Sequence, residues 1–265
     1  MTDDPARGLV LAQPPRQREL PLSDAERRAR IELAACYRVF DLLGWTESIF
    51  NHITLRVPGA TVGDTVFLIN PFGLHYCEVT ASNLVAVDLH GTPVRPTAHP
   101  VNLAGFVTHS AIHGGIADAH CVMHTHTTSG CAVACLPGGL SPDNFYGAQL
   151  HGRVGYHDFE GVTVNADERR RLLASIGQQR AVVLRHHGLL SWGGSVPEAL
   201  MWLWTLQRAC DVQLAGAAAG AVMPLQTAVL EQTSREVAAL QPAVCRAAFD
   251  AWVRRVDAID PSYRT

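Results

Sequence analysis

The sequence of 265 residues contains no lysine, so that all 21 of its basic residues are arginines. Without a lysine amine the chain cannot form a lysine Schiff base, which excludes that form of covalent catalysis on a carbonyl substrate. The arginines are not gathered in a basic run, and the formal net charge is −3. This charge pattern argues against a nucleic acid as the main partner.

Long apolar runs and cysteine pairs are also missing. No apolar stretch approaches the length that spans a membrane, and the first residues lack the pattern of a secretory signal, so we expect no membrane partner. The seven cysteines include no Cys-x-x-Cys pair, which excludes a zinc finger. Their odd number and apolar surroundings predict reduced thiols in a cytoplasmic protein. With 48% hydrophobic and 17% charged residues, the chain is expected to be globular with a substantial core.

The chain divides into a short arm and one domain. Residues 1–22 are punctuated by proline and arginine and are expected to form a loose N-terminal arm. A capping box at Ser23-x-x-Glu26 predicts the start of a helix that ends at Gly44. Strands and helices then follow in one mixed sequence, residues 140–166 are expected to be a loop with short strands, and long helices come last. Residues 23–265 are therefore expected to form a single α/β domain with C-terminal helices.

Histidines follow an apolar run in the middle of the chain. Residues 121–123 indicate a buried strand, which continues into His124-Thr125-His126. Because side chains alternate between the faces of a strand, His124 and His126 project to the same side, where two imidazoles can bind one metal ion. A pair of hydrogen-bonded histidines in the core or at the surface is the alternative.

A second apolar run, residues 181–184, also leads into histidines, Arg185-His186-His187-Gly188. Catalytic zinc sites use three protein ligands and leave one position open. His187 is the better third ligand than His186, because Gly188 after it permits a tight turn. The sequence therefore predicts one divalent metal ion, zinc, Fe(II) or manganese, bound by His124, His126 and His187.

A set of short segments carries a family resemblance. They occur in the order expected of the class II aldolase/adducin family, and within this family they are most similar to the adducin head. The segments are 50–54 (FNHIT), 71–74 (PFGL), 79–81 (VTA), 104–106 (AGF), 109–112 (HSAI), 122–126 (VMHTH) and 184–189 (LRHHGL). The resemblance implies a three-layer α/β/α sandwich with a central, mostly antiparallel sheet. It also implies the metal triad His124, His126 and His187, and a homotetramer with sites between subunits.

Two positions differ from the sugar-phosphate aldolases that the chain resembles. Those enzymes have an acid/base glutamate four residues before the position of His109, and here that position is Gly105. Their phosphate loop matches at Asn51, but its preceding glycine is replaced by Phe50. We expect weak activity on sugar phosphates, with Asn51 and Phe50 retained as substrate-binding candidates. Glu47 and Glu78 are candidate replacement carboxylates.

Three functions fit these residues. The first is a metal-dependent lyase (aldolase, decarboxylase or dehydratase) acting on a small carbonyl or hydroxy-acid substrate. The second is a non-haem Fe(II) oxygenase that oxidatively decarboxylates an aromatic 2-oxo or 2-hydroxy acid. The third is a non-catalytic, adducin-like interaction module. By resemblance adducin lacks the metal histidines, so their presence here weighs against the third function.

Further catalytic candidates are His157, Tyr146 and Tyr263. Pro261 disfavours helix at Asp260, so the C-terminal tail is expected to leave the last helix there. The resemblance implies that Tyr263 reaches the metal cleft of an adjacent subunit, and a solvated terminus is the alternative. His109 and His113 share a helix face at positions i and i+4 and are expected to support the fold.

Overall fold

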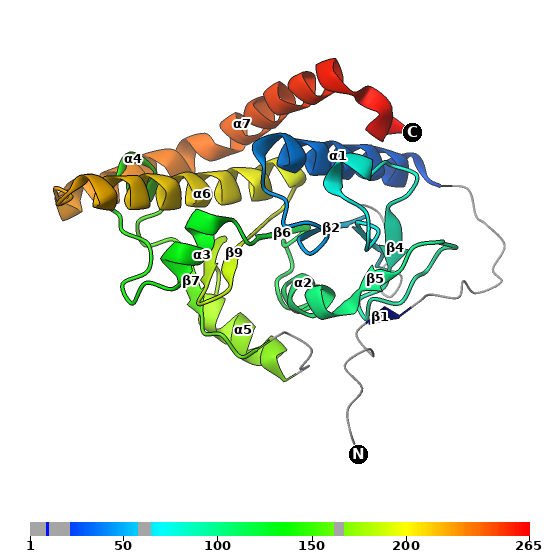
Figure 1. Ribbon diagram of the computed structural model, residues 1–265, viewed down its shortest axis with the longest axis horizontal. Coiled ribbons are helices and arrows are strands. Elements are labelled where there is room, and N and C mark those ends of the chain that lie inside the picture. Colours follow the sequence, from blue (N-terminus) through cyan, green and yellow to red (C-terminus); the bar gives the residue numbers. More distant parts are fainter. Residues whose placement is uncertain (1–8, 11–21, 58–64, 162–166) are drawn as a thin grey trace.

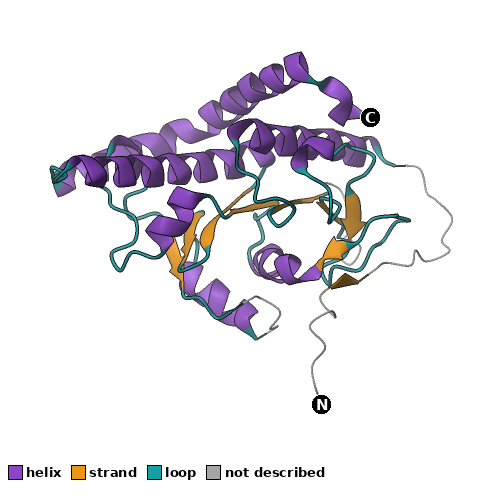
Figure 2. Cartoon of the chain, viewed as in Figure 1, coloured by secondary structure: helices purple, strands orange, loops and turns teal. Residues whose placement is uncertain are grey.

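A seven-stranded sheet forms the centre of the molecule, and helices cover both of its faces (Figures 1 and 2). The computed structural model describes residues 9–10, 22–57, 65–161 and 167–265. All neighbouring strands are antiparallel except β7 and β8, which are parallel. In sheet order the strands are β4 (Val85–Val87), β3 (Phe67–Ile69), β2 (His52–Arg56), β6 (Cys121–Thr125), β9 (Gly188–Gly193), β8 (Ala181–Leu184) and β7 (Val154–His157).

The two faces of the sheet pack against different helices, which confirms the predicted three-layer sandwich. One face, with Ile53 and Met123, packs against α1 (Asp24–Leu43) and α6 (Val196–Ala219). The opposite face, with Val122 and Leu190, packs against α2 (Leu103–Gly115) and α5 (Glu168–Ile176). Outside α1 and α6 lies the long helix α7 (Thr227–Ile259) (Figure 1). Two short helices, α3 (Thr128–Ala134) and α4 (Phe145–Gln149), complete the α-helices among the described residues. No helix in this part of the chain has the length and apolar character to cross a membrane.

Helix ends agree well with the sequence prediction. Ser23 Oγ accepts a hydrogen bond from the backbone N–H of Glu26, and Gly44 ends α1 in a left-handed conformation with φ 70°. The helix α7 continues through position 242, although proline stands there. The elements that were not predicted include the short helix α4 and strand β9. Every residue of β9 is buried and its sequence shows no alternation of polar and apolar residues, so it has no strand signature of its own.

The N-terminal arm is described only in part. Of the arm expected to be loose, the structure describes Leu9–Val10, which forms β1 and pairs with β5 (Val101–Asn102). Most of the arm lies outside the described residues.

The C-terminal tail leaves α7 at Asp260, as predicted, but it does not reach outwards. The backbone carbonyls of Tyr263 and Thr265 accept hydrogen bonds from the N–H groups of Ala81 and Ser82. The Tyr263 side chain is fully buried beside α1, and its hydroxyl donates to Asp257 Oδ1 at 2.7 Å. The expectation of a free tail is therefore wrong for this chain, because the last residues are bound to the domain that precedes them.

Replacing Tyr263 by alanine is expected to lower the free energy of unfolding by about 3–5 kcal/mol, since a buried aromatic ring is lost from the core. Urea titration followed by circular dichroism measures the change. Phe145→Ala is the matched control because that ring is 72% exposed, and it should change stability by less than about 0.5 kcal/mol. Equal stability of the two variants would contradict the docked tail.

Candidate metal centre

The pairing of three strands sets the positions of the predicted histidines. His124 on β6 lies opposite His52 on β2 and opposite Leu190 on β9. His187 lies in the turn between β8 and β9, where His186 adopts a positive φ of 56°. A Cβ at Gly188 would lie 2.3 Å from the carbonyl oxygen of Thr125. The glycine is therefore needed for close approach of β9 to β6, whereas the unusual turn conformation falls on His186.

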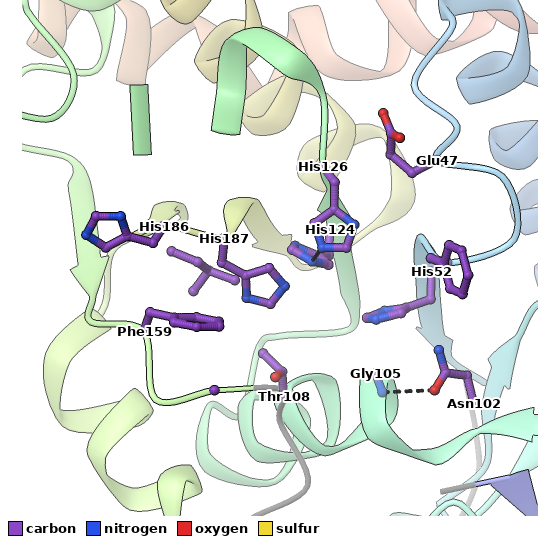
Figure 3. Close-up of a pocket in the computed structure, with 13 residues that line it drawn as sticks. Glu47, His52, Asn102, Gly105, Thr108, His124, His126, Phe159, His186 and His187 are labelled. Carbon is purple, nitrogen blue, oxygen red and sulfur yellow. Dashed lines mark hydrogen bonds between the residues drawn. The ribbon is translucent and has the colours of Figure 1, made fainter. Parts of the chain in front are cut away.

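His124, His126 and His187 come together as the sequence predicted. Each offers one ring nitrogen, and these three atoms lie within 4.8 Å of one another (Figure 3). Nε2 of His124 lies 2.7 Å from Nε2 of His126. His186 also lines the pocket, but it is not part of this cluster.

The three imidazoles suit a divalent metal ion in their protonation as well as their position. Burial lowers the pKa of His124 well below its usual range, and burial lowers the pKa of His187 to about 4. The rings are therefore neutral at pH 7, which is the form that binds a metal. His124 Nδ1 donates to the carbonyl oxygen of Leu189 at 2.8 Å, and this bond leaves the lone pair on Nε2. Zinc, Fe(II) and manganese all fit such a donor set.

The triad opens into a pocket of about 500 Å³. Its described walls combine an apolar part (Phe50, Phe159, Leu184) with polar groups from α2 and its N-terminus (Thr108, Asn102). The Asn102 side-chain oxygen accepts a hydrogen bond from the N–H of Gly105 and caps the helix. Among the described lining residues, Glu47 is the only one that is aspartate, glutamate or arginine. A small and partly apolar substrate suits this space.

A chain of hydrogen bonds that the sequence analysis did not predict runs from the pocket into the core. His52 Nδ1 lies 2.9 Å from His109 Nε2, and His109 Nδ1 lies 2.8 Å from Thr54 Oγ1. Thr54 Oγ1 lies 2.7 Å from His113 Nε2, and His113 Nδ1 lies 2.7 Å from the carbonyl oxygen of Ala119. Burial lowers the pKa of His52 and of His113 to about 3. The alternation of His52 and Thr54 along β2 was the available signal, since both face α2.

The predicted substrate-binding residues and carboxylates lie in different places. Phe50 is 56% exposed at the edge of the pocket, where Glu47 also lies. Asn51 is buried and does not line the pocket, and its side-chain nitrogen donates to the carbonyl oxygen of Trp45 at 3.1 Å. Glu78 lies elsewhere, where its carboxylate accepts a hydrogen bond from the N–H of His75.

Of the three further catalytic candidates, the structure brings only His157 close to the triad. His157 is buried, hydrogen-bonds Ser175 Oγ at 2.8 Å, and shares the lining of a smaller pocket with His187. Tyr146 packs against Trp204 and does not line the metal pocket. Tyr263 lies in the core on the other face of the sheet. We therefore do not include either tyrosine in the site proposed within this chain.

Comparison with known proteins agrees with this geometry. Residues 31–214 match the family described as "Class II Aldolase and Adducin N-terminal domain". A solved aldolase II superfamily protein from Pseudomonas syringae is 41% identical with a TM-score of 0.86, over 92% of this chain and 98% of that one. An L-fuculose 1-phosphate aldolase from Glaciozyma antarctica is 26% identical with a TM-score of 0.80, over 93% of this chain and 97% of that one. Alpha-adducin of Rattus norvegicus is 44% identical over 71% of this chain but only 26% of its own length.

The buried histidines predict how stability depends on pH. His113 has a pKa of about 3 in the folded chain, below its ordinary value of 6.5, because it is buried. Between these values the unfolded chain binds the proton and the folded chain does not, so the free energy of unfolding falls as the pH is lowered below about 6.5. One such histidine contributes a slope of up to about 1.4 kcal/mol per pH unit.

His113→Asn is expected to remove this contribution from the slope. The measurement is denaturant unfolding of metal-free protein between pH 7 and pH 5. His90→Asn is the matched control, because His90 is exposed, and it should leave the slope unchanged. A slope in His113→Asn that equals the wild-type slope would contradict a neutral, buried His113.

Proposed function

The chain belongs to the class II aldolase and adducin family, and from this premise we propose that it is a metal-dependent lyase acting on a small carbonyl or hydroxy-acid substrate. The observation that carries the proposal is the convergence of three neutral imidazoles at the wall of an open pocket. Family membership supports lyase-type chemistry in general. The adducin-like alternative is less well supported, because a non-catalytic module needs neither the triad nor the pocket.

In this proposal His124, His126 and His187 hold one divalent metal ion, which supplies Lewis-acid polarisation of the substrate carbonyl. The chain's own residues orient the substrate. The Thr108 hydroxyl and the Asn102 amide are the neutral polar groups of the wall, and they suit a carbonyl or hydroxyl group. Phe50, Phe159 and Leu184 provide an apolar surface for the rest of the substrate. The biological unit is proposed to be a homotetramer, as the family resemblance implies.

A second function rests on the same apolar surface. Two phenylalanines beside a three-histidine site would suit an aromatic 2-oxo or 2-hydroxy acid, the substrate expected of an Fe(II)-dependent oxidative decarboxylase. This function requires iron and oxygen, whereas the lyase requires no oxidant. The two proposals therefore differ in a measurable co-substrate.

The metal site is tested with two neighbouring histidines. Protein purified without oxygen or chelator is expected to contain one metal ion per chain by elemental analysis. His187→Asn should lose the metal, since a ligand is removed. His186→Asn, the matched control from the same turn, should retain it, because His186 lies outside the cluster. Retention of metal by both variants would contradict the proposed ligands.

The reaction class is tested with a panel of small 2-oxo acids, 2-hydroxy acids and ketoses, with products followed by NMR and oxygen by electrode. Removal of the metal should abolish cleavage and its return should restore cleavage, with no oxygen consumed. Turnover that consumes oxygen and requires Fe(II) would replace the lyase by the oxidative decarboxylase. Metal-independent cleavage would overturn both proposals.

Phosphorylated sugars are expected to gain little from their phosphate. The described pocket wall offers no arginine to bind the anion, and its only acidic side chain, Glu47, repels it. The measurement is kcat/KM for L-fuculose 1-phosphate and for L-fuculose, which acts as the matched control. We expect a ratio near one or below. A preference for the phosphate of about 10²-fold, or roughly 2.7 kcal/mol, would reveal an anion site and contradict this expectation.

A further inference from the structure

The series of hydrogen bonds behind the pocket, from His52 through His109 and Thr54 to His113, has a defined donor-to-acceptor direction. It ends on a backbone carbonyl, which can only accept a hydrogen bond. The carbonyl oxygen of Ala119 has no proton, so His113 Nδ1 must donate to it. His113 is buried and neutral, and its second nitrogen, Nε2, therefore carries a lone pair. Thr54 Oγ1, at 2.7 Å, is the only hydrogen-bond partner of that nitrogen among the described residues, and its hydroxyl donates to it.

The next two hydrogen bonds, towards the pocket, have fixed directions for the same reason. Thr54 has one hydroxyl proton, which is committed to His113, so its oxygen accepts from His109 Nδ1. A neutral His109 protonated on Nδ1 has its lone pair on Nε2, which accepts from His52 Nδ1. His52 is thus protonated on Nδ1 and unprotonated on Nε2. A single backbone carbonyl sets the tautomers of three histidines in succession.

The free ring nitrogen of His52, Nε2, lies at the pocket end of this series of hydrogen bonds. His52 lines the pocket, and its ring points from β2 towards the three metal-site imidazoles (Figure 3). Its Nδ1 is bound to His109, and Nε2 has no hydrogen-bond partner among the residues that the structure describes. The ring is 5% exposed and is held on its inner edge by His109, which is fully buried. An acceptor nitrogen is therefore presented in a fixed orientation.

Gly105 makes room for this nitrogen. A Cβ at position 105 would lie 2.3 Å from His52 Nε2 and 2.4 Å from its Cδ2, distances that no side chain could occupy. The ring of His52 thus takes the space into which a side chain at position 105 would project. A carboxylate at 105 and the observed ring of His52 exclude each other.

We propose that His52 is a catalytic residue, whose Nε2 accepts and returns the proton that the lyase reaction moves, and that Thr54, His109 and His113 are positioning residues. This inference rests on the proposed lyase function and identifies the base that Gly105 does not supply. It assigns the acid/base group to β2, whereas the carboxylate expected from the family resemblance would be on α2.

For cleavage of a β-hydroxy carbonyl compound, the step balances with one proton. The hydroxyl O–H bond breaks, its proton forms a bond to His52 Nε2, and the oxygen electron pair forms the new carbonyl. The electron pair of the broken C–C bond stays on the carbon next to the substrate carbonyl. That carbon then takes the proton back from Nε2, and His52 returns to its initial state.

Glu47 is the competing base within the same pocket. It lines the wall and is exposed, so its carboxylate is solvated, and the structure provides no described hydrogen bond that would orient it. His52 is chosen on geometry, because a general base must be held in reach of the proton that it removes. Its lowered pKa leaves Nε2 unprotonated and makes it a weak base. Glu47→Gln therefore separates the two candidates.

The tautomer is measured without any substrate. Nitrogen NMR of zinc-loaded protein with ¹⁵N-labelled histidine distinguishes protonated from unprotonated ring nitrogens, and the loss of signals in His52→Asn assigns this residue. We expect His52 with Nδ1 protonated and Nε2 unprotonated. The opposite tautomer would overturn the inference, whatever reaction the protein catalyses.

The catalytic role is measured by proton exchange, with pyruvate and hydroxyacetone as probes in deuterium oxide. His52→Asn retains an N–H that can donate to His109 but has no basic nitrogen, and it should slow exchange by about 10²–10⁴-fold with metal content unchanged. The exposed control His90→Asn should exchange at the wild-type rate, and Glu47→Gln should slow exchange by less than His52→Asn does. A normal rate in His52→Asn, or a loss in Glu47→Gln alone, would overturn the inference and leave the lyase proposal intact.

Thr54 tests the positioning chain. Thr54→Val removes the hydroxyl that links His109 to His113 and should lower kcat by roughly 10–100-fold with little change in KM. Thr54→Ser keeps the hydroxyl and should restore kcat. Equal losses of kcat in both variants would show that side-chain packing matters and the hydrogen bond does not. This result would overturn the positioning role of Thr54, His109 and His113. A wild-type protein that exchanges neither probe and cleaves nothing would instead overturn the proposed function on which this inference rests.

Discussion

The antiparallel pairing of β2 with β6, and of β6 with β9, is the constraint on which the whole site depends. It places His52 opposite His124, and it brings the β8–β9 turn with His187 to the same end of the sheet. A slip of one residue in β6 would turn His124 towards the core beneath α1 and α6. Gly188 allows the required approach, since any side chain there would meet the Thr125 carbonyl. The register of three strands therefore determines the positions of both the proposed metal ligands and the group that faces them.

Burial gives these histidines a shared chemical state. Burial lowers the pKa of each of His52, His109, His113 and His124, so that all four are neutral imidazoles at pH 7. A neutral imidazole has one donor and one acceptor nitrogen, and each buried donor or acceptor left without a partner would cost about 1–3 kcal/mol. Backbone carbonyls at Leu189 and Ala119 accept the protons of His124 and His113, which belong to two separate groups of hydrogen bonds. The free lone pairs that remain are those directed at the pocket.

Much of the fold and the triad could be predicted because the relevant signals are local in sequence. Alternation along a strand placed His124 and His126 on one side, and a capping serine and a glycine marked the ends of α1. The sequence around His52 gives no signal for its proposed role, because this role depends on His109 and His113 on α2 and on the space left by Gly105. Strand β9, buried on both faces, gave no pattern. The predicted position of Tyr263 was wrong because the backbone partners of the tail, Ala81 and Ser82, lie about 180 residues earlier in the chain.

In the proposed site three histidines bind the metal, and a fourth, His52, faces it as a free base. Diffraction from crystals of the zinc-loaded protein, recorded at the zinc absorption edge, tests both parts in one measurement. We expect a single anomalous peak about 2.0–2.1 Å from ring nitrogens of His124, His126 and His187, with Nε2 of His124 as its ligand atom. We also expect that His52 keeps its bond to His109 and does not reach the metal. A peak elsewhere, or His52 Nε2 bonded to the zinc, would contradict the proposed site.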